Sequence, residues 1–229
     1  IQDIFGNALE EFSKIANVNF QYNGFYNSIS EAQASSVDFI YTPDYLAGGT
    51  IASAFFPYWE ENGSQDNTID FDPSNFLGDY GQSYFDNFAT WVIIHETGHS
   101  LGLKHPHHPS SIGLNDYTMG YSNPYSQSTA FSTLFTAMSY TSESGFSGTD
   151  VYNAVTPMLY DINVLQALYG TPSYDGYVGD TEHAVVSSQT YKTIYEVGGN
   201  DTISAAAADV GWYIELTSSS TDISWNQDM

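Results

Sequence analysis

The chain has 229 residues, of which 41% are hydrophobic and 16% aromatic, so it can bury a real core and is not expected to be disordered. Three Lys and Arg residues stand against 27 Asp and Glu residues, giving a formal net charge of −24. Such a surface repels nucleic acid and anionic membranes, which we exclude as partners. Cys is absent, so an extracellular form must gain its rigidity from packing or from metals.

No run of apolar residues reaches the length of a transmembrane helix, and the N-terminus lacks the features of a signal peptide. Residues 1–16 carry apolar side chains at helical spacing and predict the first helix. Because this stripe already runs at Ile1, we expect that natural sequence preceding it is missing. Four short runs then predict strands, at residues 18–22, 37–41, 51–56 and 68–72.

Two longer helices are predicted further along the chain, at residues 82–102 and 157–169. Between them, residues 106–135 are rich in Ser, Asn, Tyr, Pro and Gly and predict a long loop. The composition changes after Gly170 to short β-like runs with many Gly, Asp, Ser and Thr residues. We therefore predict two parts, a domain at 1–171 and a β-rich tail at 172–229.

One motif dominates the sequence: H-E-x-x-H-x-x-G-x-x-H, formed by His95, Glu96, His99, Gly102 and His105. On a helix, the first two histidines lie four residues apart and project from the same face, where they can hold a zinc ion. The glutamate can reach a water on that ion rather than the ion itself. The glycine can end the helix in a left-handed turn, which brings the third histidine back as a ligand.

Three protein ligands leave the fourth position of a tetrahedral zinc open for water, which is typical of a catalytic site. The alternative is a helix whose histidines are packed or solvated by chance. The extended motif makes this reading improbable, because three of the six histidines of the chain fall within it. His107 and His108 follow in the predicted loop, and we interpret them as solvated residues rather than further ligands.

Pro106, directly after the third histidine, makes the motif resemble the serralysin branch of the metzincin zinc endopeptidases. Residues 137–140, Ala-Met-Ser-Tyr, are similar to the Met-turn of that family. The resemblance implies that Met138 forms the hydrophobic floor under the zinc. It also implies that Tyr140 binds zinc in the resting enzyme and then swings to hydrogen-bond the oxyanion. Without the resemblance, both residues would be interpreted as packing residues.

Residues 156–170 are similar to the last helix of the family's catalytic domain, residues 8–20 to its first helix, and residues 51–57 to its substrate-binding edge strand. The resemblance therefore implies an α+β fold with a twisted, mostly parallel sheet, an active-site helix, a Met-turn and a C-terminal helix. The opening strand, the pro-segment and the nonapeptide calcium repeats of the family are not found in this sequence.

The resemblance implies a secreted, extracellular, bacterial-type zinc metalloendopeptidase that acts as a monomer on polypeptides and that a protein inhibitor could bind. Glu96 would act as general base, and Tyr140 would share the oxyanion charge with the metal. An extended substrate would pair with Ala52, Ser53 and Ala54. Two alternatives stay open: a catalytically inactive, calcium-stabilised binding or adhesion module, and a zinc hydrolase for substrates other than peptides. The intact Glu96 argues against the first.

Two glycine-rich segments of the tail, residues 177–181 and 196–201, resemble the paired loops that open the calcium-binding region of serralysins. They offer the carboxylate, hydroxyl and carbonyl oxygens that Ca²⁺ prefers. The resemblance implies a structural calcium ion with these ligands: Tyr177, Gly179, Thr181, Glu196, Gly198 and Asp201. Glu196 departs from the family, which usually has Asp there. The alternative is a pair of Gly-Asp turns between strands.

Overall fold

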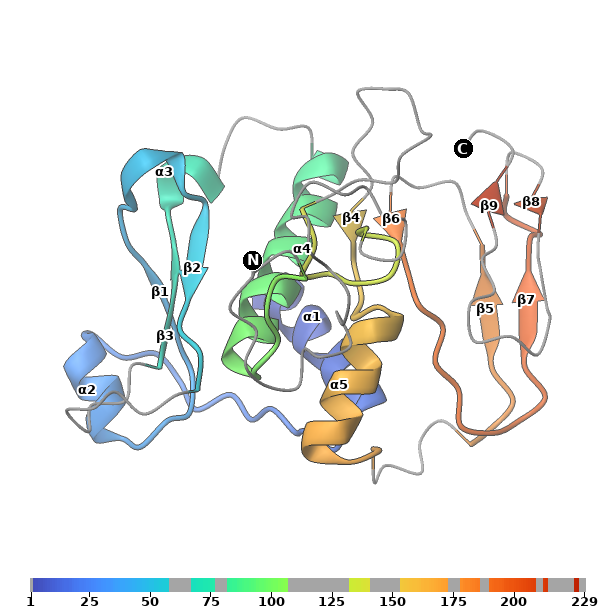
Figure 1. The fold of residues 1–229 in the computed structure, drawn as a ribbon, viewed down its shortest axis with the longest axis horizontal. Helices are drawn as coiled ribbons and strands as arrows, with labels where there is room; N and C mark the ends of the chain where they lie inside the picture. Colours follow the sequence, from blue (N-terminus) through green and yellow to red (C-terminus); the bar gives the residue numbers. More distant parts are fainter. Residues whose placement is uncertain are drawn as a thin grey trace.

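The computed structural model describes residues 2–57, 67–76, 82–106, 132–140, 153–172, 178–185, 190–208, 212–213 and 225–226. In this part of the chain, helices gather at the centre between a small sheet on one side and a β-rich tail on the other (Figure 1). The predicted mixture of helices and strands is confirmed. Within the described residues, no helix combines the length and the apolar character needed to cross a membrane.

The three predicted helices are all present, with ends shifted by at most two residues. They are α1 (Gln2–Ile15), α4 (Gln82–Ser100) and α5 (Leu159–Tyr169). Three short helices were not predicted: α2 (Ile29–Ala34), α3 (Pro73–Phe76) and the 3-10 helix η1 (Ala47–Gly49). A signal for α2 was present in the sequence, because the Ser28 side chain accepts a hydrogen bond from the backbone N–H of Glu31, as an N-cap does.

The sheet contains β1 (Ile40–Pro43), β2 (Ala52–Ala54) and β3 (Thr68–Phe71), in the order β1-β3-β2. β1 runs parallel to β3, whereas β2 runs antiparallel to it, with Ala52 opposite Phe71. The described sheet is therefore mixed rather than mostly parallel. β2 lies at its edge, and it also contacts α4.

The strand predicted at residues 18–22 is wrong, because these residues belong to no strand. Residues 18–21 do alternate between half-buried and exposed, but Tyr22 breaks the pattern because it is exposed. The alternation serves aromatic packing instead, since the Phe20 ring lies 6.2 Å from that of Phe12 and 6.1 Å from that of Phe39. The alternation of apolar residues therefore indicated which side chains pack inward, but it did not indicate that the segment pairs with another strand.

The core forms around α4, whose last turns are buried on every side. α1 packs against α4 and α5, and the sheet contacts α4 from another direction. The largest fully buried apolar side chains come from all of these elements and from the segment 132–140: Phe12, Ile69, Ile93, Ile94, Met138 and Leu165. A helix enclosed in this way is a rigid support for the side chains it carries.

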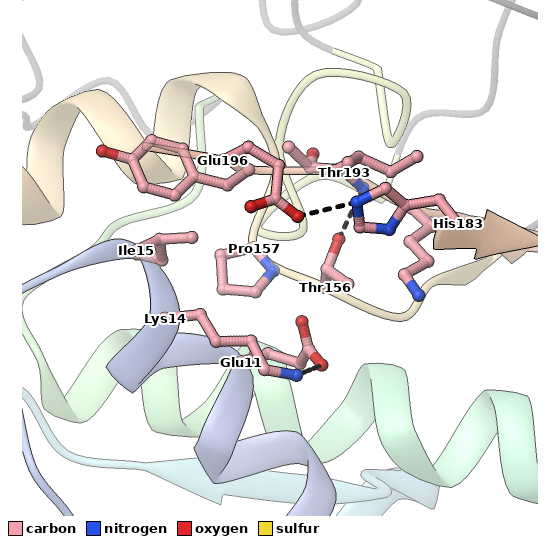
Figure 2. A pocket seen from close by; sticks show the side chains of 11 residues that line it. Glu11, Lys14, Ile15, Thr156, Pro157, His183, Thr193 and Glu196 are labelled. Atoms are coloured by element: carbon pink, nitrogen blue, oxygen red, sulfur yellow. Dashed lines mark hydrogen bonds and ion pairs between the residues drawn. The ribbon is translucent and has the colours of Figure 1, made fainter. Parts of the chain in front are cut away.

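The described strands of the tail all belong to short pairs. β4 (Asn153–Ala154) pairs with β6 (Thr190–Tyr191), β5 (Glu182–Ala184) with β7 (Thr202–Ser204), and β8 (Trp212–Tyr213) with β9 (Trp225–Asn226). The first of these pairs joins the two parts predicted on either side of residue 171. Figure 2 shows the pocket between α1, the start of α5 and the tail, where His183 faces Glu196. The division at 171 stays a prediction.

A buried carboxylate joins α5 to the segment 132–140. Asp161 accepts hydrogen bonds from the Thr136 hydroxyl at 2.6 Å, the Ala137 N–H at 2.7 Å and the Met158 N–H at 2.9 Å. Burial raises the pKa of Asp161 to about 6, and the three hydrogen bonds oppose that rise. The carboxylate is therefore mostly ionised at neutral pH, and it fixes the backbone of residues 136–138 to the helix.

We expect Asp161→Ala to lower the free energy of unfolding by about 3 kcal/mol or more, because it leaves several buried donors without an acceptor. Asp161→Asn should lose less, since its amide oxygen can still accept from two N–H groups. Urea unfolding of the metal-loaded protein, followed by circular dichroism, measures both variants. An alanine variant as stable as the parent would contradict this role for Asp161.

Candidate metal centre

The end of α4 turns the chain back on itself. The Leu103 N–H donates to the carbonyl of Gly98 at 2.9 Å, and the Gly102 N–H donates to that of His99 at 2.9 Å. This pair of bonds is a Schellman motif, which requires a left-handed residue between the helix and the returning chain. Gly102 supplies it with a φ of 102°. The turn predicted from the glycine is therefore present, and it directs residues 103–105 back toward the helix.

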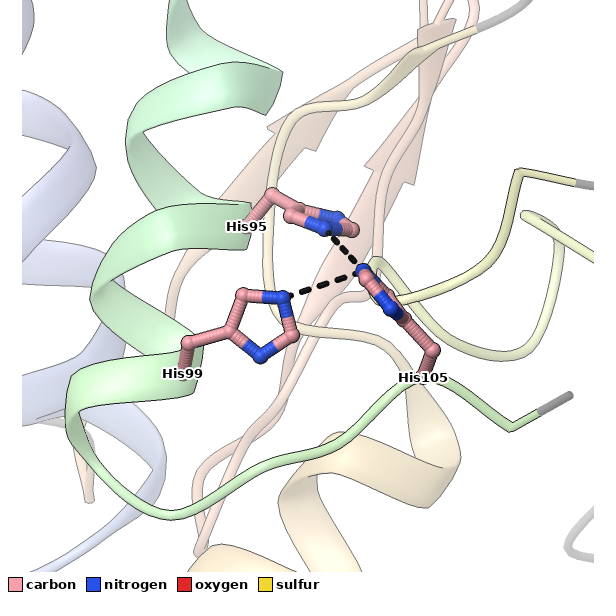
Figure 3. A group of neighbouring side chains, drawn as sticks. All are labelled: His95, His99 and His105. Carbon is pink, nitrogen blue, oxygen red and sulfur yellow. Dashed lines mark hydrogen bonds between the residues drawn. The ribbon is translucent and has the colours of Figure 1, made fainter. Parts of the chain in front are cut away.

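The three motif histidines meet beyond this turn (Figure 3). The Nε2 atom of His105 lies 2.9 Å from Nε2 of His95 and 3.0 Å from Nε2 of His99. Two nitrogen ligands that each bind zinc at about 2.0–2.1 Å lie roughly 3 Å apart, so these separations suit a shared ion. Among the described residues, this is the only group of three or more His, Cys, Asp and Glu side chains that could hold a metal ion.

Hydrogen bonds on the opposite ring nitrogens fix which nitrogen faces the cluster. Nδ1 of His95 lies 2.8 Å from the carbonyl of Ala137, and Nδ1 of His99 lies 2.8 Å from that of Leu103. A carbonyl can only accept, so each Nδ1 must carry the proton and each Nε2 keeps its lone pair for a metal. Burial lowers the pKa of His99, which favours the neutral form that a ligand needs. The residues therefore fit a zinc ion.

Met138, which the resemblance places under the zinc, packs against α4 at Gly98. It is buried, and a Cβ added to Gly98 would come within 2.8 Å of its sulfur. The helix can approach the methionine so closely only because residue 98, next to the predicted ligand His99, has no side chain. Sequence reasoning did not single out Gly98.

Glu96 is 7% exposed and points toward β2, where the backbone of Ala54 forms a hydrogen bond with its carboxyl group. Burial raises the pKa of Glu96 to about 7, and this hydrogen bond opposes the rise. A carboxyl group with a pKa near neutrality can exchange protons at neutral pH. The structure thereby brings the middle of the predicted substrate strand, Ala52–Ala54, beside the predicted general base.

Tyr140 stacks on His95, one of the three clustered histidines. Its ring lies 5.0 Å from that of His95 at an interplanar angle of 22°, and its hydroxyl is 3.1 Å from Nε2 of the same residue. Although the side chain is 59% exposed, burial of its hydroxyl and then the charge of Glu96 raise its pKa to about 12. The phenol therefore keeps its proton and remains a hydrogen-bond donor.

Trp91 is a part of the site that sequence reasoning missed. Its Nε1–H donates to the carbonyl of Ala137 at 3.0 Å, the same oxygen that accepts from His95. Its ring also lies 5.4 Å from the imidazole of His95 and 6.2 Å from the ring of Tyr140. Its position four residues before His95 places it on the same face of α4, which was the available signal.

In the tail, the structure brings three of the predicted calcium ligands together. The Thr181 hydroxyl lies 2.9 Å from Oε1 of Glu196 and 2.9 Å from Oδ1 of Asp201. The predicted carbonyl ligands Gly179 and Gly198 lie in these two loops. The backbones of the loops approach each other closely, because a Cβ atom added to Gly199 would collide with the carbonyl group of Gly179.

His183 also reaches this tail cluster, which the sequence did not suggest. Its Nε2 lies 2.6 Å from Oε1 of Glu196. The predicted ligand Tyr177 lies outside the described residues, as do His107 and His108 and most of the predicted loop at 106–135.

The sequence of the chain is similar to those of known metallopeptidases. The model of the Peptidase_M10 family, Matrixin, matches residues 1–129. Metallopeptidase AprA of Pseudomonas marginalis is 30% identical over 222 residues, which cover 86% of this chain and 42% of that protein. Serralysin G of Dickeya chrysanthemi is 27% identical over 92% of this chain and 44% of its own length. Serralysin of Proteus mirabilis is 27% identical over 85% of this chain and 42% of its own length.

The chain thus spans less than half the length of these curated relatives. The family model nevertheless covers more than half of this chain, including the whole histidine motif and α4. Together with the serralysin relatives, this match shows that the chain belongs to the matrixin family of peptidases, Peptidase_M10, as a serralysin-like member.

Proposed function

We propose that the chain is the catalytic part of a zinc-dependent endopeptidase. The observation that carries this proposal is the convergence of three Nε2 atoms beside a buried carboxyl group whose pKa is raised to about 7. The names of the relatives, metallopeptidase and serralysin, support it. Because the relatives are more than twice as long, the activity of the whole protein is part of the proposal.

His95, His99 and His105 would hold the zinc. When bound, zinc supplies a Lewis acid that polarises the scissile carbonyl and lowers the pKa of water toward about 7. Glu96 acts as general base, taking the proton of the attacking water and passing it to the leaving amine. The Ala54 hydrogen bond holds this carboxyl group in place between the edge strand and the helix.

Tyr140 donates a hydrogen bond to the oxyanion that develops in the transition state. Its protonated hydroxyl, 3.1 Å from Nε2 of His95, is close enough to serve as an additional zinc ligand in the resting enzyme. Both roles require the ring to move over a short distance while it remains beside His95. The high pKa of Tyr140 supports the donor role.

Polypeptides are the substrates that suit this geometry. An extended segment can pair antiparallel with β2, because β2 is the edge of the described sheet and lies beside Glu96. We further propose that the protein works outside the cell as a monomer, open to protein inhibitors. The inactive binding module is not favoured, since the relatives carry enzyme names and a binding module has no need of Glu96.

Glu96→Ala should abolish proteolysis while the zinc stays bound, because the general base is not a ligand. The loss expected from removal of a general base is about 10²–10⁴-fold. Casein cleavage with and without a chelator measures activity, and elemental analysis measures zinc. Glu10→Ala, which removes an exposed carboxylate from α1, is the matched control. A Glu96 variant that keeps more than about a tenth of the activity would refute the assignment.

We also propose that the tail binds a structural calcium ion through Thr181, Glu196 and Asp201, with carbonyl oxygens of Tyr177, Gly179 and Gly198. The clustering of the first three side chains supports this proposal. One oxygen of Glu196, Oε2, is buried without a hydrogen-bond partner in the described structure, so a cation could satisfy it.

Calcium should raise the melting temperature of the zinc-loaded protein. At a concentration about 100 times its Kd, a ligand of the native state stabilises by about 2.7 kcal/mol, or about 5 °C or more for a chain of this size. Thermal melting in zinc-containing buffer with and without Ca²⁺ measures the shift. Asp201→Asn should remove most of it, whereas Asp44→Asn, remote from the tail cluster, should not. A melting temperature that ignores Ca²⁺ would rule out the stabilising site.

A further inference from the structure

The acidic chain has only three Lys and Arg residues, and one of them, Lys104, lies near the histidine cluster. Lys104 directly precedes the ligand His105, and its Nζ lies 5.9 Å from the centre of the Phe56 ring. That ring in turn meets the imidazole of His99 edge to face, with centroids 5.1 Å apart. The half-buried Lys104 is therefore linked to His99 through the Phe56 ring, over which its ammonium group makes a cation–π contact.

The other two basic residues lie elsewhere. Lys14 on α1 is bound to Glu11 at 2.7 Å, and Lys192 follows β6 in the tail. Both line the pocket between α1 and the tail that is drawn in Figure 2. With a formal net charge of −24, the protein as a whole repels acidic peptides. Lys104, through Phe56, brings a basic side chain close to His99.

The direction of β2 tells which part of a substrate would meet Lys104. Ala54 bonds to Glu96, so this residue lies next to the reacting bond. The chain then continues from Ala54 through Phe55 to Phe56. A substrate that pairs antiparallel with β2 places its N-terminal side along this continuation. Lys104 accordingly faces the residues that precede the scissile bond.

We infer that Lys104 is a specificity-determining residue that favours an acidic side chain on the N-terminal side of the scissile bond. The inference rests on the proposed peptidase function and on the antiparallel docking of the substrate. A partly exposed ion pair of this kind changes the specificity constant by about two- to fivefold, and less in high salt.

The test uses pairs of fluorogenic peptides that the zinc-loaded protein cleaves and that differ only by Asp or Asn, placed two or three residues before the scissile bond. At low ionic strength, the ratio of kcat/KM for the Asp and Asn peptides should exceed one in the parent. Lys104→Met should bring the ratio down by about two- to fivefold, Lys104→Arg should retain it, and Lys104→Glu should invert it. Lys192→Met makes the same change in net charge in the tail and should leave the ratio unchanged.

Equal ratios in the parent and in Lys104→Met would overturn the inference. So would an equal shift in Lys192→Met, because the effect would then come from net charge alone. If no peptide is cleaved at all, the proposed function fails, and fluorescence anisotropy still decides the inference. In that case the same Asp and Asn peptides, bound to the parent and to Lys104→Met, should show the charge preference in Kd, and its absence would overturn the role of Lys104.

Discussion

The hydrogen bond from Nδ1 of His95 to the carbonyl of Ala137 is the contact on which the rest of the site depends. It sets the tautomer of the imidazole, so that Nε2 faces His105 and remains a potential metal ligand. It also ties α4 to the segment that carries Met138 and Tyr140. That segment is itself held by Asp161, which bonds the N–H of the same Ala137 whose carbonyl serves the histidine. One residue, Ala137, thus connects His95 with α5.

The surrounding fold explains why this arrangement can be maintained without disulfides. The last turns of α4 are buried, and α4 contacts α1, β4, the sheet and the segment 132–140, so His95 and His99 start from a fixed backbone. The third predicted ligand, His105, comes from outside the helix, and the turn at Gly102 limits where it can go. A metal bound there would connect both sides of that turn, and its binding free energy would add to folding stability.

The parts of the site that the sequence predicted are those encoded by local geometry. Helical spacing and a glycine were enough to place His95, His99 and His105 together, because only ten residues of one helix and one turn separate them. The strand predicted at residues 18–22 failed because its apolar residues pack against aromatic neighbours distant in sequence. The contact of Lys104 with Phe56 could not be predicted from the sequence either, because tertiary packing brings these two distant residues together. The resemblance to serralysins supplied predictions that spacing could not, such as the roles of Met138 and Tyr140.

X-ray absorption at the zinc K-edge of the purified protein tests the central claim most directly. The account predicts one zinc per chain, with a first shell that includes three imidazole nitrogens at about 2.0–2.1 Å. His105→Ala should reduce the imidazole contribution by one nitrogen or abolish zinc binding. A purified protein that takes up no zinc, or a zinc spectrum that His105→Ala leaves unchanged, would contradict the proposal that these three histidines form the metal centre.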